Sequence, residues 1–387
     1  MTNLPTIPAA EYPQRTERLR ALMHRKGLEA VLLGTGPNLT YFSGYPSPSR
    51  SGSRPFFLIL PLMGEPILIV QSGRKEEAVR YAHVQDVRDY AELSRVPVDM
   101  IRGALHERGA RAVGLELGLE QSFDVPYLEF CRLREGLANT RLVDASDILW
   151  QARMIKSENE IACLRAACAI LTDAYLAAFA SARGGMTERQ IANIIFAHCD
   201  QAEAGDRFLV MTSGQGNYDL PSKPPEARLV QAGDMVWFDA GCTVSGYWSD
   251  FSRAGVVGEP SAQQIAAQEA IHQITGEAVR RIRPGILASS IARFCNQKVA
   301  ELDFPITQDI SGRAARCGHG VGLNLTELPH ISESDHTVLE PGMVIAIEPA
   351  VATEYGTFHI EENVLVTQDG YEVLSQAPYH LRHIART

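Results

Sequence analysis

Four carboxylates and one histidine in the C-terminal half of the sequence have the types and spacing of a metal-binding set. The first two, Asp239 and Asp250, are equidistant from a turn centred near Val244-Ser245, so a simple hairpin would place them opposite each other. Like charges that face each other across a strand pair destabilise it unless positive charge lies between them. This spacing predicts a cation site in the hairpin.

A second pair of carboxylates repeats the design further along the chain. Glu348 ends the apolar run MVIAI and Glu361 lies within HIEENVLV, and both are equidistant from Glu354-Tyr355. Unpaired carboxylates among buried apolar residues are costly. The second hairpin therefore also indicates a cation.

His319, in the stretch GHGVGLNLTELP, is the candidate nitrogen ligand. Its flanking glycines let the backbone come close to a site. An oxygen-rich set with one imidazole suits Mn, Co, Fe or Zn, and four carboxylates balance two divalent cations. A two-metal centre of this kind holds a water or hydroxide ready to attack a carbonyl.

The elements that must carry these residues indicate two α/β (α+β) domains. A helix over 15–27, followed by short alternating strands and helices, predicts a small N-terminal domain over 1–150. A long helix over 155–172 opens a second domain, 151–387, in which two hairpins alternate with helices over 262–282 and 287–302.

Composition excludes several classes of partner and compartment. The formal net charge of -10, with no block of Lys and Arg, argues against nucleic acid. No uninterrupted apolar run reaches about 18 residues, so we expect no membrane span. The seven scattered cysteines contain no CxxC pair and favour a reducing cytoplasm.

Several motifs, in order, resemble the pita-bread metallopeptidase family, which includes creatinase, Xaa-Pro aminopeptidase, prolidase and methionine aminopeptidase. FDAGCTVSGYWSDFSR, GHGVGL, AIEPA and HIEEN resemble its metal-bearing motifs. GPNLTYFSGY looks like the signature of its creatinase-type N-terminal domain, and ARMIKSENEI looks like the junction between the domains. The resemblance covers nearly the whole chain and implies a pita-bread catalytic domain.

The resemblance also implies an activity. Asp239, Asp250, His319, Glu348 and Glu361 would ligate two metal ions (Mn, Co, Zn or Fe), with Glu348 doubling as general base. The expected enzyme is a homodimeric hydrolase resembling Xaa-Pro dipeptidase or aminopeptidase, in which a metal-bridged hydroxide cleaves an amide C-N bond in a dipeptide or small amidated metabolite.

The residues expected around the metals depart from the proline-specific pattern. Thr326 stands where those members carry a histidine, Ala352 replaces a tyrosine and His359 replaces an arginine. A second histidine position falls on Ser222 or Pro221. The alternative is therefore a non-peptidase member, hydrolase or lyase, acting on a small zwitterionic metabolite; a non-catalytic binding protein is a third.

Five side chains are candidates for substrate binding. Thr326, His330 and His359 are chosen for proximity to the ligands, Ser222 because it falls on the second histidine position of the family, and Arg54 for its reach toward a substrate carboxylate.

Overall fold

The computed structural model describes residues 4–46 and 54–386, which form two compact units. One unit runs from Pro8 to Arg153. The other contains the segment that ends at Ile7 together with residues 154–387. The SPSRSGS tract that precedes Arg54 in the sequence lies outside the described residues.

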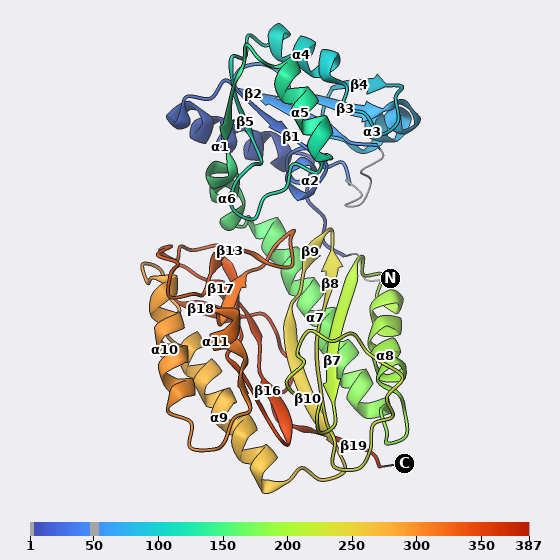
Figure 1. Cartoon of the computed structure of the whole chain (residues 1–387), viewed down its shortest axis with the longest axis vertical. Helices are drawn as coiled ribbons and strands as arrows, with labels where there is room; N and C mark the ends of the chain where they lie inside the picture. Colours follow the sequence, from blue (N-terminus) through green and yellow to red (C-terminus); the bar gives the residue numbers. More distant parts are fainter. Residues whose placement is uncertain (1–3, 47–53, 387) are drawn as a thin grey trace. The chain divides into compact units, whose positions relative to one another are not determined.

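The N-terminal unit is built on one mixed sheet of six strands, in the order β4-β3-β2-β1-β5-β6 (Figure 1). Its elements are α1 (Glu11–Lys26), β1 (Ala30–Leu33), α2 (Pro37–Ser43), β2 (Phe57–Pro61), β3 (Ile67–Gln71), a 3-10 turn (Ser72–Arg74), α3 (Lys75–Tyr81), β4 (Asp86–Tyr90), α4 (Val98–Glu107), β5 (Ala112–Leu115), α5 (Tyr127–Gly136), β6 (Arg141–Asp144) and α6 (Ser146–Met154). The predicted first helix is confirmed, with its end at left-handed Gly27, although it begins at Glu11 and not at residue 15.

The C-terminal unit carries two strand-and-helix layers of similar design. Its elements are α7 (Glu158–Ser181), α8 (Glu188–Gln201), β7 (Arg207–Ser213), β8 (Met235–Val244), β9 (Tyr247–Trp248), β10 (Phe251–Val257), α9 (Ala262–Val279), α10 (Ala288–Ala300), β11 (Gln308–Asp309), α11 (Ile310–Ala314), β12 (Gly318–Gly320), β13 (Glu327–His330), β14 (Val344–Ile347), β15 (Ala350–Thr353), β16 (Gly356–His359), β17 (Glu362–Val366), β18 (Tyr371–Val373) and β19 (Arg382–Ile384). Figure 1 shows α7 and α8 beside the β7–β8–β10 strands, and α9 and α10 beside the later strands.

Helix α7 begins later and runs further than the sequence pattern predicted. Ser157 accepts from the backbone of Glu160, and the Glu160 side chain accepts from the backbone of Ser157, so this reciprocal cap sets the start of the helix. By length and composition α7 is also apolar enough to cross a membrane, but more than half of its apolar window is buried inside the protein. It is the core helix of this unit, because its apolar residues pack on β8 and β10.

The first hairpin has a different register from the predicted one. Ser245 and Gly246 both have positive φ, 50° and 84°, as a two-residue type I′ turn requires. The turn is therefore centred one residue later than predicted, and Asp239 faces Ser252 instead of Asp250. Asp250 lies between β9 and β10, diagonal to Asp239. The dipeptide Ser-Gly before Tyr247 was the sequence signal for this turn.

The second hairpin has the predicted register but not the predicted continuity. Ile347 pairs with Glu362 and Ala350 pairs with His359, so Glu348 and Glu361 are at matching positions. However, β14 and β17 belong to a five-stranded sheet, whereas β15 and β16 belong to a separate three-stranded sheet. Each arm of the hairpin therefore passes from one sheet to the other at its glutamate, Glu348 in the first arm and Glu361 in the second.

We predict that Gly246→Ala destabilises the protein by about 1–2 kcal/mol, because an L side chain is strained at this φ. An added Cβ would also crowd Leu323. The matched change Ser245→Asn should cost little, since asparagine tolerates the left-handed conformation. Denaturant unfolding of both variants measures the difference, and equal stability would rule out the type I′ turn.

Candidate metal centre

The two aspartates reach the centre from β8 and from the start of β10. Asp239 points from the middle of β8, and Asp250 is 3% exposed. The backbone of Asp250 is held on both sides by Asn363, whose Oδ1 accepts from the Asp250 N–H at 2.9 Å and whose Nδ2 donates to the Asp250 carbonyl at 2.5 Å. A buried amide thus fixes one candidate ligand.

The two glutamates reach the centre where the strands change sheets. Neither Glu348 nor Glu361 lies inside a strand, so each can turn its carboxylate away from the pleat. Glu361 is 1% exposed, whereas the Glu348 side chain is 17% exposed. Of these two, Glu348 has the more exposed side chain.

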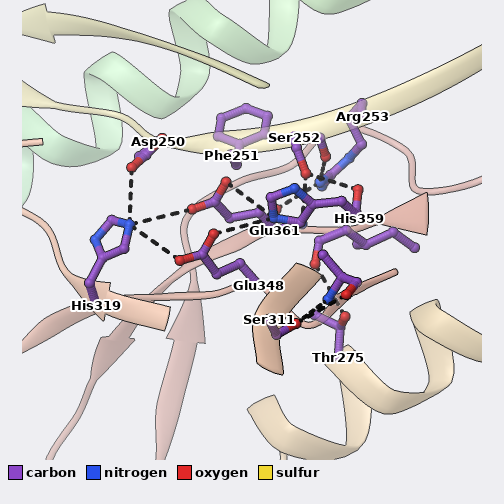
Figure 2. A network of polar contacts seen from close by, with 12 residues as sticks. Asp250, Phe251, Ser252, Arg253, Thr275, Ser311, His319, Glu348, His359 and Glu361 are labelled. Atoms are coloured by element: carbon purple, nitrogen blue, oxygen red, sulfur yellow. Dashed lines mark hydrogen bonds and ion pairs between the residues drawn. The ribbon is translucent and has the colours of Figure 1, made fainter. Parts of the chain in front are cut away.

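His319 on β12 faces three of the carboxylates through its Nε2 atom (Figure 2). The separations are 3.5 Å to Asp250 Oδ2, 3.6 Å to Glu348 Oε1 and 3.9 Å to Glu361 Oε1. Nδ1 lies 3.0 Å from the carbonyl oxygen of Gly320, which can only accept, so Nδ1 carries the proton. In the neutral ring Nε2 therefore offers its lone pair to the centre.

The glycines around His319 allow this close packing. A side chain at Gly318 would clash with the carbonyl oxygen of Ala346, and one at Gly320 would clash with that of Leu328. Strand β12, which carries His319, thus packs between β13 and β14 with no room for a side chain at Gly318 or Gly320.

The carboxylates cannot all stay ionised without added positive charge. Burial, together with the neighbouring carboxylates, raises the pKa of Asp239 to about 6 and raises the pKa values of Asp250 and Glu361 well above their usual range. Burial also opposes ionisation of Glu348, but His359, His319 and Arg316 outweigh it and lower the pKa of Glu348 to about 2.

Two buried oxygens have no hydrogen-bond donor: Asp239 Oδ1 and Glu361 Oε2. Buried acceptors are nearly always paired, and a carboxylate oxygen is a hard ligand for a divalent cation. Two sets of side chains could each hold a metal ion, because the possible ligand atoms within each set lie within 4.8 Å of one another. One set is Asp250, His319 and Glu361, and the other is Glu348, His359 and Glu361. The residues present fit divalent metal ions.

A cavity of about 220 Å³ opens on this cluster. It is lined by Phe208, Val210, Pro221, Ser222, Trp237, Asp239, Asp250, Ile310, Ser311, Ala314, Arg316, His319, Leu325, Thr326, Glu348, Ala350, His359 and Glu361. The volume lies below the roughly 300–1,000 Å³ typical of pockets for drug-sized ligands. The cavity suits a small ligand.

The five predicted substrate residues differ in position. Thr326, Ser222 and His359 line the cavity. His330 pairs with His319 across β12 and β13 but is not among the lining residues. Arg54 is an exposed residue of the N-terminal unit. Their roles in binding stay predictions.

Sequence reasoning missed Arg316 and Trp237. Among the described residues that line the cavity, Arg316 is the one side chain with a permanent positive charge, and its Nε lies 3.8 Å from Glu348 Oε1. Its place three residues before His319 was the available signal. Trp237, two residues before Asp239, stacks on His359 with ring centroids 5.2 Å apart.

A buried arginine supports the cluster from behind. Arg253 is 1% exposed. Its Nη2 donates to both carboxylate oxygens of Glu362 at 2.8 and 3.0 Å, and its Nη1 donates to the Glu361 carbonyl at 2.9 Å. Ser375 also donates to Glu362. Glu362 is therefore committed to Arg253, whereas its neighbour Glu361 faces the cavity.

Comparison with known families decides what this cluster belongs to. Residues 162–368 match Metallopeptidase family M24, and residues 15–155 match the Creatinase/Prolidase N-terminal domain. The chain belongs to metallopeptidase family M24. It is thus a metallohydrolase that uses divalent metal ions, and all five predicted ligands lie within the M24 region.

Relatives and solved structures agree with this membership of M24. The chain is 29% identical over 372 residues to the Xaa-Pro dipeptidase of Pyrococcus horikoshii, covering 95% of this chain and 98% of the relative. The crystal structure of the prolidase from Pyrococcus horikoshii OT3 superposes with a TM-score of 0.81 at 27% identity, covering 94% and 99%. Dipeptidase PepE from Mycobacterium ulcerans gives 0.84 at 25% identity, covering 98% and 100%. The predicted two-part pita-bread fold is confirmed.

We predict that Asn363→Ala weakens metal binding roughly 10- to 100-fold, because it leaves both backbone groups of Asp250 buried without a partner. Calorimetric titration of the folded variant with Mn²⁺ or Co²⁺ measures this. Asn296→Ala, which removes an exposed amide bonded to Glu333, is the control and should bind like the parent. Unchanged affinity in Asn363→Ala would show that this amide does not position Asp250.

Proposed function

We propose that this M24 protein is a dinuclear metal-dependent dipeptidase that cleaves the amide C–N bond of a dipeptide or a small amidated metabolite. The observation that carries the proposal is the convergence of four carboxylates and His319 at one small cavity. The Xaa-Pro dipeptidase that resembles the chain over nearly its whole length supports the substrate class.

The proposed metal ligands are Asp239, Asp250, His319, Glu348 and Glu361. Bound divalent ions supply Lewis acidity toward the scissile carbonyl and make water nucleophilic at neutral pH. The formal charges support two ions, since four carboxylates balance two divalent cations. Mn, Co, Zn and Fe all suit such donors.

Glu348 is the proposed general base. It is the more accessible of the two glutamates, and its low pKa, to which Arg316 contributes, leaves the carboxylate ionised. It takes a proton from the attacking water and passes it to the leaving nitrogen. The C–N bond breaks, water is added across it, and an acid and an amine result.

Arg316 and Thr326 are the proposed substrate-binding groups. With the carboxylates neutralised by metal, Arg316 leaves the cavity with a net positive charge and suits the free carboxylate of a dipeptide. The Thr326 hydroxyl is an uncharged donor that can bind a polar group of the substrate. The cavity volume limits the substrate to a small molecule.

We also propose a homodimer in the cytoplasm. The dimer rests on the family resemblance. The cytoplasm is supported by the seven cysteines, all of which are free thiols and six of which are buried.

Chelation should abolish activity, and added Mn²⁺ or Co²⁺ should restore it. A product screen of the metal-loaded protein should show hydrolysis of dipeptides, with Xaa-Pro and other dipeptides tested beside small betaines and cyclic amidines. Turnover of the betaines or amidines alone would replace the dipeptidase proposal with the small-metabolite alternative. Full activity in chelator would overturn the metal mechanism.

Glu348→Gln should lower kcat about 10²- to 10⁴-fold in the same screen. The exposed Glu340→Gln change is its control.

Arg316→Gln should raise KM about 10- to 100-fold for dipeptides with a free carboxylate, because a charge-assisted contact is lost. The KM for the corresponding dipeptide amides should change little. Arg313→Gln removes an exposed arginine three residues away and should leave both constants unchanged. An equal rise for acids and amides would assign Arg316 to neutralising Glu348 instead.

A further inference from the structure

His359 is held rigidly at the wall of the cavity. It ends β16, and its carbonyl oxygen accepts from Ser252 Oγ at 2.9 Å and from Trp237 Nε1 at 3.3 Å. Its ring stacks on the Trp237 indole at an interplanar angle of 23°. Backbone and ring are thus both fixed before any ligand binds.

Both ring nitrogens of His359 are buried without a hydrogen-bond partner. The residue is 6% exposed, and neither Nδ1 nor Nε2 has a donor or acceptor at hydrogen-bond geometry. A buried polar atom without a partner is costly, so its retention requires another interaction.

The nearest polar atoms to His359 Nε2 are carboxylate oxygens of the centre (Figure 2). Glu348 Oε2 lies at 3.4 Å and Glu361 Oε2 at 3.9 Å, and the latter oxygen itself lacks a hydrogen bond. Ligand atoms about 2.0–2.2 Å from one ion stand about 3.0 Å apart at a right angle and about 3.4 Å apart at the tetrahedral angle. The observed separations fall at or somewhat above this range.

We propose that His359 is a sixth ligand of the metal centre, donating Nε2 to the ion that Glu348 and Glu361 hold. The inference rests on the proposed dinuclear function. His319 and His359 approach different oxygens of the same two glutamates, His319 the Oε1 atoms and His359 the Oε2 atoms. With His359 as a ligand, each of the two ions would have one imidazole, and the carboxylates would be shared between them. The five ligands proposed above provide only one imidazole for both ions.

A second nitrogen donor changes which metals the centre prefers. Imidazole suits Zn, Co and Fe, whereas an all-oxygen position suits Mn. The ion held by His359 should therefore be Zn, Co or Fe. The arginine that proline-specific members carry at this position is permanently protonated and could not ligate a metal ion.

X-ray absorption of the full chain loaded with Zn²⁺ or Co²⁺ tests the proposal, because imidazole scattering counts the histidine ligands. We expect about two imidazoles per pair of ions in the parent protein and about one in His359→Gln. Titration should show one of the two ions bound about 100-fold more weakly in the variant, with Mn²⁺ affected less than Zn²⁺. His383→Gln, which removes an exposed histidine beside Glu259, should match the parent in every measurement.

The parent spectrum decides the question even if His359→Gln fails to fold. One imidazole per pair of ions in the parent overturns the sixth ligand and leaves the proposed function intact, with His359 acting on Glu348 as a hydrogen-bond partner. A parent protein that binds no metal overturns the proposed function itself. Two imidazoles that persist in His359→Gln would assign the second one to another histidine and also overturn the inference.

Discussion

The burial of four carboxylates around one point is the constraint on which the rest of the catalytic unit depends. Each ionised group raises the cost of ionising the others, and burial removes the water that would screen them. Positive charge must therefore be supplied, and the chain itself supplies some through Arg316, whose Nε lies 3.8 Å from Glu348 Oε1. Divalent metal ions supply the remainder, which is the common chemistry of M24.

The sheets are interrupted where this cluster forms. Strand pleating would send neighbouring side chains to opposite faces and hold each carboxylate to the spacing of the ladder. Asp250, Glu348 and Glu361 all lie at breaks between strands, whereas Asp239 stays within one. Side chains satisfy backbone groups at two of these breaks. Asn363 holds Asp250, and the Ser252 hydroxyl accepts from the Glu361 N–H at 3.1 Å while it donates to the His359 carbonyl.

The proposed substrate-binding residues are a different set from the proposed metal ligands. The candidate ligands come from motifs that resemble those of the family, but Thr326, His359 and Arg316 give the cavity its own pattern of donors and charge. His319 and His359 both line this cavity, and Arg316 brings a permanent positive charge to it. In our proposals, His359 affects which metal is preferred and Arg316 affects which substrate charge is bound.

The sequence by itself determined the alternation of elements, the two-part fold and the candidate ligand set, because these depend on local periodicity and on motif spacing. It also predicted the register of Glu348 and Glu361, because the second turn is centred at Glu354-Tyr355, where the equal spacing placed it. It did not determine the offset of Asp239 from Asp250, which depends on the backbone angles of Ser245 and Gly246. Only the tertiary structure decided that Arg316 and His359 share a cavity with the ligands, because their approach depends on packing between strands of separate sheets.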